Sequence, residues 1–189
     1  MGKLKVGFDI DGCMNNFQIE LQEILKNDYN LILPPKVHNW NEYIKKISDL
    51  NEFWEKYNGI IEDRMPAEKG ASKTLTALGD ICERNIVTAR GYRCADVTES
   101  WLHKHNLVYD NIYWECDTKL YACKYLGIEY MIEDSPINAQ LMADNGIKVL
   151  LFERRYNNFL CHPNIDHCQS WDEVYEKLSY INYKNIIKG

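Results

Sequence analysis

The sequence predicts an α/β fold in which a central parallel sheet lies between layers of helices. Short apolar segments of strand length recur along the chain, and segments with helical periodicity separate them. Such alternation is typical of a parallel sheet with helices on both faces. Residues 15–65, which contain no good strand, interrupt the alternation directly after the first strand. We therefore expect one sheet domain with a small helical insertion.

Five segments are predicted as strands because apolar, β-branched and aromatic side chains dominate them. They are residues 4–10, 82–88, 109–114, 128–133 and 147–152. Helical periodicity predicts the joining helices, and their ends carry a proline at a first position, glycines after last turns and a Ser-x-x-Glu capping box. These helices are residues 67–78, 95–105, 118–126, 136–145 and about 170–181.

Residues 15–65 form the predicted insertion, a helical cap. Three short helices are expected there, at 16–27, about 40–47 and about 51–58, and Pro34-Pro35 separates the first two. The chain is therefore expected to divide into a core, residues 1–14 and 66–189, and this cap.

Composition and charge narrow the classes of function. The formal net charge is −6 and no long basic run is present, so we expect no extended nucleic-acid or anionic-membrane surface. No apolar run reaches the roughly 20 residues that a membrane span needs. The first strand begins almost at Met1, which leaves no signal peptide, and seven scattered cysteines are typical of reduced thiols. We expect a cytoplasmic protein, and a homodimer is left open.

Chemically active side chains stand where the predicted strands end. In an open parallel sheet, ligands bind beyond the carboxyl ends of the strands. The residues at those ends are Asp9 and Asp11 after the first strand, Thr88 after the second, and Glu133 and Asp134 after the fourth. Lys119 begins the helix before the fourth strand and can reach the same edge from the side.

Each of these residues also has an ordinary structural explanation. The two aspartates could begin a solvated turn, because Asp and Gly are common turn residues. Thr88 could simply end its strand, and Glu133 could cap the helix that follows. Lys119 could be a solvated helix residue, with Lys124 as the alternative lysine.

The four motifs, Asp9-x-Asp11, Thr88, Lys119 and Glu133-Asp134, resemble those of the haloacid dehalogenase superfamily of phosphohydrolases in their order and in their places. The resemblance covers roughly residues 1–14 and 67–155. It implies a haloacid-dehalogenase-like Rossmannoid fold of three layers. It also implies that the insertion is a cap of the superfamily's first class, which closes over the site and excludes water.

The resemblance implies a role for each acid. Asp9 would be the nucleophile that becomes an aspartyl-phosphate, and Asp11 would be the general acid and then the general base. Mg²⁺ would bind the Asp9 carboxylate, the Asp11 backbone carbonyl and Asp134, with Glu133 in an outer shell. Asp11 argues against dehalogenase chemistry, which lacks this second acid in the superfamily.

The resemblance also implies a phosphate site formed by Thr88, Ala89, Arg90 and Lys119. Thr88 would donate a hydrogen bond to a phosphoryl oxygen, and Lys119 would offset the negative charge of Asp9 and the phosphate. Arg90 could grip the phosphate or a sugar oxygen, or it could be a surface arginine paired with an acid of the cap.

Cys13 departs from the superfamily pattern, which usually has Thr or Val at this position. A thiol nucleophile is the alternative interpretation. The flanking acids should raise a thiol pKa, however, and no histidine is near in the sequence. We interpret Cys13 as a small side chain that packs in the core.

The segment CHPNIDHC, residues 161–168, suggests a zinc site through Cys161, His162, His167 and Cys168. The two Cys-His pairs have no intervening residues, which does not match the spacing of common zinc sites. We expect a loop between the last strand and the last helix instead.

Within the superfamily, FDIDG, IVTARGYR, YMIEDSPINA and VLLFERRYN are most similar to the 5′(3′)-deoxyribonucleotidases of the deoxy-pyrimidine cytosolic type and their bacterial nucleotidase-like branch. The animal enzymes differ after the second motif, so their fine specificity is not implied. Aromatic residues of the insertion could stack on a base or form the cap's own core. They are Trp40, Tyr43, Phe53, Trp54 and Tyr57.

Three functions are compared. The leading hypothesis is a Mg²⁺-dependent phosphomonoesterase for a small phosphate ester, a nucleoside monophosphate. The second is a phosphatase for sugar phosphates or another small metabolite. The third is an inactive phosphate-binding or metal-binding regulator, which would have no need of Asp11.

Overall fold

A computed structural model of the chain describes residues 2–32, 46–47, 53, 65–116 and 118–188. Six strands form one sheet in the order β3-β2-β1-β4-β5-β6, and every neighbouring pair is parallel. The strands are β1 (Leu4–Phe8), β2 (Cys82–Val87), β3 (Asn111–Tyr113), β4 (Tyr130–Glu133), β5 (Lys148–Phe152) and β6 (Ile165–Cys168). The α/β class and the parallel sheet are therefore confirmed.

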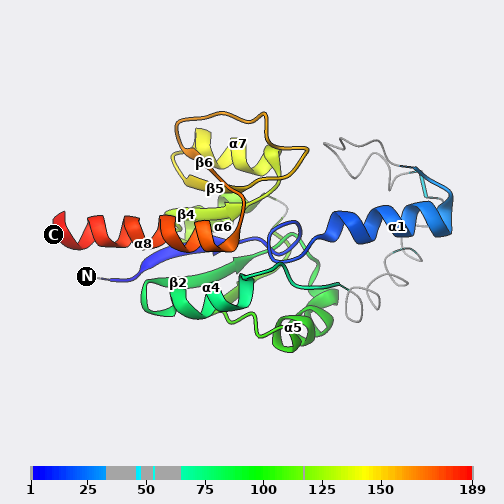
Figure 1. The fold of residues 1–189 in the computed structure, drawn as a ribbon, viewed down its shortest axis with the longest axis horizontal. Coiled ribbons are helices and arrows are strands. Elements are labelled where there is room, and N and C mark those ends of the chain that lie inside the picture. The colour runs from blue at the N-terminus through cyan, green and yellow to red at the C-terminus, as the bar shows by residue number, and fades with distance from the viewer. Residues whose placement is uncertain (1, 33–45, 48–52, 54–64, 117, 189) are drawn as a thin grey trace.

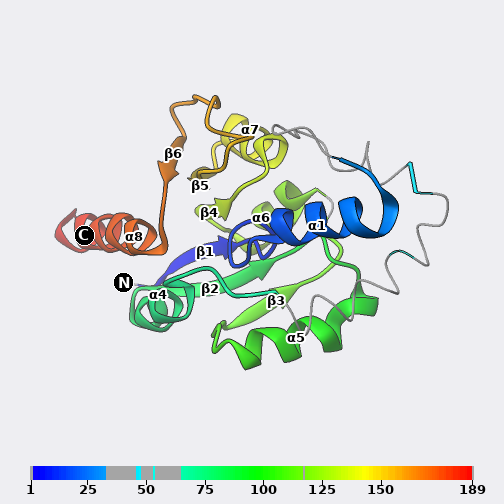
Figure 2. The same cartoon turned by 45° about the vertical axis from the view of Figure 1, so that its right-hand side comes forward.

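Helices cover both faces of this sheet, which gives three layers (Figures 1 and 2). The helices are α1 (Phe17–Tyr29), α4 (Ala71–Ala77), α5 (Ala95–Lys104), α6 (Lys119–Leu126), α7 (Pro136–Asp144) and α8 (Trp171–Lys188). Two single turns of 3₁₀ helix, η1 (Leu78–Asp80) and η2 (Tyr92–Cys94), precede β2 and α5. Helices α4, α5 and α8 contribute to one apolar cluster, whereas α6 and α7 contribute to another.

The two apolar clusters hold the central strands rigidly between them. On the first face, Phe8 of β1 stacks on Trp171 of α8 with their ring centroids 6.1 Å apart. On the second face, Met131 of β4 is fully buried among residues of α6 and α7. Close packing of this kind fixes the position of each strand relative to its neighbours. The carboxyl ends of β1, β2 and β4 are therefore held in place next to one another.

Both chain termini lie at one end of the molecule, and α1 projects from the opposite end (Figure 1). Because α1 follows β1 by a short turn, it marks the carboxyl edge of the sheet. This is the edge at which the sequence predicts the site.

The tail differs from the prediction. Residues 161–168 were expected to form a loop, but Ile165–Cys168 form β6 and pair with β5. The strand is short, lies at the sheet edge and buries only Cys168 fully. Backbone hydrogen bonding rather than apolar burial explains it, so the apolar pattern did not reveal it.

Two helix ends also differ from the prediction. The helix expected at 67–78 begins only at Ala71, because Gly70 has φ +89°, a left-handed conformation that an α-helix does not contain. The last helix runs to Lys188 instead of ending near 181.

The predicted cap lies largely outside the described residues. Helix α1 agrees with the expected helix 16–27, whereas the helices expected near 40–47 and 51–58 are almost wholly outside the described part of the chain. Phe53 is fully buried and packs with Leu21 and Leu25 of α1. The surroundings of Phe53 therefore match the alternative in which the aromatic residues of the insertion form its own core. The division between core and cap remains a prediction.

Candidate active site

The chain turns sharply after β1. The backbone N–H groups of Cys13, Met14 and Asn15 all point at the carbonyl oxygen of Ile10, at 2.8–3.3 Å. Gly12 sits inside this turn with φ +86°, and a Cβ atom built on it would lie 2.0 Å from Asp134 Oδ2. Only glycine allows both the conformation and this close approach. The turn therefore brings the end of β1 against the end of β4.

Three buried carboxylates meet at this point: Asp9, Glu133 and Asp134. One ligand oxygen from each lies within 4.8 Å of the others. Lys119 Nζ lies 2.5 Å from Asp9 Oδ2 and 2.8 Å from Glu133 Oε2. The alternative lysine, Lys124, is exposed and donates to Asn145 Oδ1 instead. The structure thus brings together one ammonium and three carboxylates, which leaves a surplus of negative charge.

This surplus appears in the acid–base properties of the cluster. Burial raises the pKa of Asp9 to about 7, with Lys119 opposing the shift and Glu133 adding to it. Burial also raises the pKa of Asp134 to about 7, and Asp9 adds to that shift. Burial would lower the pKa of Lys119, but its two carboxylate neighbours raise it above its ordinary value. A divalent cation with oxygen ligands would relieve this crowding, so the donor set fits Mg²⁺.

Glu133 contacts Lys119 and the residue before α7, although the side chain that caps this helix is that of Ser135. Its Oε2 atom accepts from Lys119, and its Oε1 atom accepts from the backbone N–H of Ser135 at 2.9 Å. Ser135 in turn caps α7, because its hydroxyl accepts from the Asn138 N–H. Glu133 therefore supports the lysine and the start of the helix together.

Asp11 does not join the acid cluster but pairs with Arg90. The guanidinium donates from Nε to Asp11 Oδ2 at 2.8 Å and from Nη2 to Oδ1 at 2.6 Å. Asn15 donates a further hydrogen bond to Oδ1 at 3.0 Å, and Arg90 Nη1 donates to Thr98. Burial would raise the pKa of Asp11, but the Arg90 charge and hydrogen bonds outweigh it and lower that pKa. Arg90 is thus partnered by a site acid, whereas the sequence suggested phosphate, a sugar oxygen or a cap acid.

The segment after β2 lies beside this pair. Thr88 is buried, and its hydroxyl accepts from the Arg90 backbone N–H at 3.1 Å. Ala89 between them is exposed. Residues Glu115 and Cys116 donate backbone hydrogen bonds to the carbonyls of Arg90 and Thr88, both at 2.9 Å. The loop after β3 therefore holds the backbone of Thr88–Arg90, the predicted phosphate site, by hydrogen bonds.

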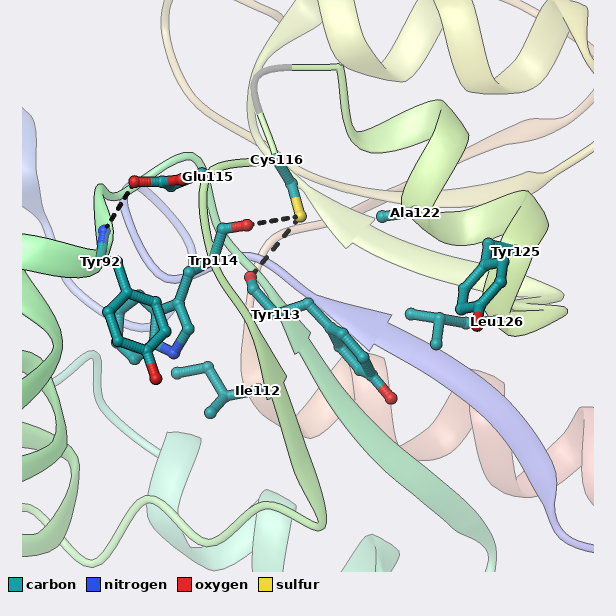
Figure 3. Close-up of a pocket in the computed structure, with 9 residues that line it drawn as sticks. All are labelled: Tyr92, Ile112, Tyr113, Trp114, Glu115, Cys116, Ala122, Tyr125 and Leu126. Carbon is teal, nitrogen blue, oxygen red and sulfur yellow. Dashed lines mark hydrogen bonds between the residues drawn. The ribbon is translucent and has the colours of Figure 1, made fainter.

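That same loop forms one wall of an aromatic pocket of about 350 Å³ (Figure 3). Tyr92, Tyr113, Trp114 and Tyr125 contribute aromatic rings to its lining, and none of the nine lining residues belongs to the acid cluster. The Tyr92 and Trp114 rings meet edge to face, with centroids 6.2 Å apart. Glu115 accepts from the Tyr92 backbone N–H at 3.2 Å. An apolar surface thus adjoins the segment Thr88–Arg90.

Sequence reasoning missed three residues that touch the site from the loop after β5. The Tyr156 hydroxyl donates to Asp134 Oδ2, Asn157 donates to the Asp134 carbonyl at 2.7 Å, and Arg154 donates to the Gly12 carbonyl. All three lie within the stretch VLLFERRYN, which contributed to the family resemblance without a role for any single residue. A run of polar residues directly after a buried strand was the available signal.

Cys13 and the tail cysteines take no part in a metal cluster within the described parts of the chain. Cys13 is fully buried, and burial together with the Asp134 charge raises its pKa well above the ordinary range, which does not suit a nucleophile. His162 lies 3.4 Å from Asp144, and His167 contacts Leu160 and Glu153 rather than Cys161 or Cys168.

Comparisons with known proteins agree with this arrangement. The family model described as "5′ nucleotidase, deoxy (Pyrimidine), cytosolic type C protein" matches residues 3–185. A nucleotidase of Clostridium acetobutylicum is 29% identical over 181 residues, which cover 93% of each chain.

Two solved structures share the fold. A haloacid dehalogenase-like hydrolase of Streptococcus pneumoniae superposes with a TM-score of 0.66 at 14% identity, over 93% of this chain and 98% of the other. A HAD hydrolase of Bacillus subtilis, solved bound to magnesium, superposes with a TM-score of 0.62 at 17% identity, over 94% and 99%. With the family match, the fold and the acid cluster together, the chain belongs to the cytosolic type C 5′-nucleotidase family of the haloacid dehalogenase superfamily, and it is a hydrolase of phosphoric monoesters.

Proposed function

We propose that the chain is a Mg²⁺-dependent phosphomonoesterase that forms an aspartyl-phosphate on Asp9 and acts on nucleoside monophosphates. The observation that carries the proposal is the buried cluster of Asp9, Glu133 and Asp134 around Lys119. A structural ion pair would not need a second and third carboxylate in a buried place, because unpaired buried charge is costly.

The cation would be held by the carboxylates of Asp9 and Asp134 and by the backbone carbonyl of Asp11. When bound, Mg²⁺ supplies positive charge that lets a phosphate dianion approach the acids. The raised pKa of Asp134 in the metal-free chain supports this assignment, because it reports how strongly the site favours added positive charge.

Asp9 attacks the phosphorus atom, a new P–O bond forms, and the bond to the leaving oxygen breaks. Lys119, at 2.5 Å from the Asp9 carboxylate, keeps that carboxylate oriented and offsets charge on the phosphate. Thr88 has its hydroxyl at the end of β2 and Arg90 has its guanidinium next to Asp11. We assign both groups to the phosphoryl oxygens of the substrate, with Ala89 between them.

Asp11 accepts the proton of the water that hydrolyses the aspartyl-phosphate. Its lowered pKa suits this step, because a general base has to be ionised before it can act. In the preceding step it carries a proton to the leaving oxygen. A phosphate that draws hydrogen bonds from Arg90 would loosen the pair and make that protonation easier.

The family match and the name of the Clostridium relative favour a nucleotide as the substrate. The aromatic pocket beside Thr88–Arg90 supports the same class, because a base offers a flat ring for aromatic side chains to contact. The cap, residues 15–65, would close over the leaving group and complete its recognition.

The location is proposed to be cytoplasmic. All seven cysteines are free thiols. Among the described residues, none of the helices is both long and apolar enough to cross a membrane. Free thiols in such number are typical of a reducing compartment.

A hydrolysis panel tests the proposal. Purified chain with Mg²⁺ is assayed for phosphate release from nucleoside monophosphates, sugar phosphates and an aryl phosphate. We expect the highest kcat/KM for at least one nucleotide and no turnover by Asp9→Asn. The matched control is Asp144→Asn, a carboxylate that is 55% exposed and away from the cluster.

Two outcomes would contradict the proposal in different ways. If sugar phosphates are hydrolysed best and nucleotides are ignored, the nucleotide assignment fails and the phosphatase assignment stands. If Asp9→Asn retains wild-type turnover, Asp9 is not the nucleophile.

A further inference from the structure

The loop after β5 contacts the acid cluster through Asp134. Tyr156 is 5% exposed, and its hydroxyl donates to Oδ2 of Asp134. A carboxylate has two oxygens with about four lone-pair sites, so this hydrogen bond leaves acceptor sites for a cation. The contact also selects one rotation of the Asp134 side chain about its terminal torsion, which is otherwise broad.

Asn157 fixes the backbone of the same residue. Its side chain is fully buried, and Nδ2 donates both to the Asp134 carbonyl at 2.7 Å and to the Phe152 carbonyl at 2.9 Å. Its Oδ1 atom accepts from the Arg154 backbone N–H at 2.7 Å. The ends of β4 and β5 and the loop itself are therefore joined through one amide group.

Arg154 fixes the other side of the site. Its guanidinium donates twice to the Gly12 carbonyl, from Nε at 2.9 Å and from Nη2 at 2.7 Å. Nη2 also lies 2.6 Å from Glu68 Oε1, and the guanidinium lies 4.6 Å from the Phe152 ring centroid. These contacts orient the turn that carries Asp9 and Asp11 against β5.

One short loop thus holds both halves of the predicted cation site. Gly12 and Asp134 approach so closely that a single added carbon would collide with the carboxylate. Their separation is therefore sensitive to small shifts, and Arg154 and Tyr156 contact the two members of the pair. Residues of this kind around a metal site typically change its affinity about 10–100-fold when they are altered.

We propose that Arg154, Tyr156 and Asn157 are positioning residues that hold the Asp9 turn and Asp134 at the separation that binds the catalytic cation. The proposal rests on the proposed function for the identity of that cation, Mg²⁺. The three residues act through Gly12 and Asp134 rather than on the substrate, so their loss is expected to weaken Mg²⁺ binding more than it impairs the folded core.

Mg²⁺ binding to the substrate-free chain tests the proposal by isothermal titration calorimetry. Tyr156→Phe removes only the hydroxyl, and we expect it to raise the Kd for Mg²⁺ by about 10-fold or more. Arg154→Met is expected to weaken binding similarly, and Arg154→Lys less, because lysine keeps the charge but loses the fork of donors. At saturating Mg²⁺, kcat should recover, so the defect appears in the metal requirement.

The matched controls are Arg155→Met and Tyr121→Phe. Arg155 is the exposed neighbour of Arg154, and Tyr121 is 75% exposed on α6. Both control variants should bind Mg²⁺ as the wild type does. Melting temperatures measured in a chelator show separately whether any variant has lost stability.

The possible failures can be distinguished. Unchanged Mg²⁺ affinity in Tyr156→Phe and Arg154→Met overturns the positioning role, and a drop in melting temperature alone would make these residues purely structural. A wild-type chain that binds no Mg²⁺ overturns the metal assignment and the positioning role with it. A wild-type chain that binds Mg²⁺ as expected but hydrolyses no phosphomonoester rejects the proposed function and leaves the positioning role standing.

Discussion

Asp9 and Asp11 stand one residue apart, yet their surroundings drive their acidities in opposite directions. Burial next to Glu133 raises the pKa of Asp9 to about 7. The bidentate contact with Arg90 lowers the pKa of Asp11. Neighbouring titratable groups whose pKa values are pushed apart are typical of sites that divide chemical roles between two carboxylates.

This division leads to a prediction about leaving groups. Asp11→Asn keeps a side chain of the same size that can still contact Arg90, but it removes the proton donor. We expect hydrolysis to slow most for alkyl phosphates, whose leaving oxygens need the proton, by about 10²–10⁴-fold. The measurement is kcat/KM for a series of phosphate esters of rising leaving-group pKa. Equal slowing of aryl and alkyl esters would mean that leaving-group protonation is not the main contribution of Asp11.

At the level of single residues, the sequence predicts which acids and which lysine form the site, but not the contacts that loop side chains make with them. Asp9, Asp134 and Lys119 converge because they follow strand ends or begin a helix at one edge, which periodicity and chain order already indicate. The partners of Arg90 and the contacts of Tyr156 depend on side-chain directions in loops. No local pattern encodes those directions, because they follow from packing between segments far apart in the chain.

Among elements, β2 is tied to the segment that leads into β3. Arg84 of β2 donates from Nη2 to Asp110 Oδ1 at 2.8 Å, and its Nε and backbone N–H groups donate to Oδ2. The hydrogen bonds from Arg84 lower the pKa of Asp110. The pair therefore anchors the edge strand from which the braced loop, residues 114–116, continues.

The lowered pKa predicts a pH-dependent contribution to stability. Because the folded-state pKa of Asp110 lies below its unfolded value, near 3.9, the contribution is present above that value and is lost as pH falls through the folded pKa. Asp110→Asn should lower the free energy of unfolding at pH 7 by roughly 1 kcal/mol or less, since the side chain is 37% exposed. The deficit should shrink in acid below pH 4.

Denaturant unfolding at both pH values provides the measurement, with the exposed Asp80→Asn as the control. A deficit that stays the same in acid would show that the charge of Asp110 contributes little. The edge-strand tie would then depend on hydrogen bonds alone.

The elements themselves were predictable wherever the apolar pattern determines them. Five strands and the helices between them follow that pattern, because their buried faces supply it. The edge strand β6 has one fully buried residue, and the last turns of α8 extend beyond its buried residues. In α8, Lys184 lies over the Tyr180 ring at 4.3 Å, a contact one turn apart that supports the helix without core burial. Local contacts of this kind leave little trace in hydrophobic periodicity.

For the whole molecule, the apolar core stabilises the fold, whereas the buried acids destabilise it. The chain carries a formal net charge of −6, and three of its carboxylates meet inside the sheet edge with one lysine between two of them. The apolar clusters on both sheet faces hold this arrangement in place. The fold therefore holds together a site in which a bound cation would reduce the repulsion between the carboxylates.

The last prediction concerns how the destabilising effect of the buried carboxylates depends on pH and Mg²⁺. In the metal-free chain the pKa of Asp134 is raised to about 7, above an unfolded value near 3.9, so the folded state holds a proton that the unfolded state releases between about pH 4 and 7. The stability contribution of this group therefore falls as pH rises through that window. Asp134→Asn should be about as stable as the wild type at or below pH 4 and more stable at pH 8, both measured by denaturant unfolding in a chelator.

Mg²⁺ should reduce that stability difference at pH 8. A ligand that binds only the folded state stabilises it by about 2.7 kcal/mol when present at 100 times its Kd. For a chain of this size, that gain raises Tm by roughly 5–10 °C. The wild type should show the gain and Asp134→Asn should lose most of it, because the variant lacks both the crowded charge and the ligand. If the metal-free wild type at pH 8 is as stable as the variant, the buried acids do not burden the fold, and electrostatic crowding is not what prepares this site for a cation.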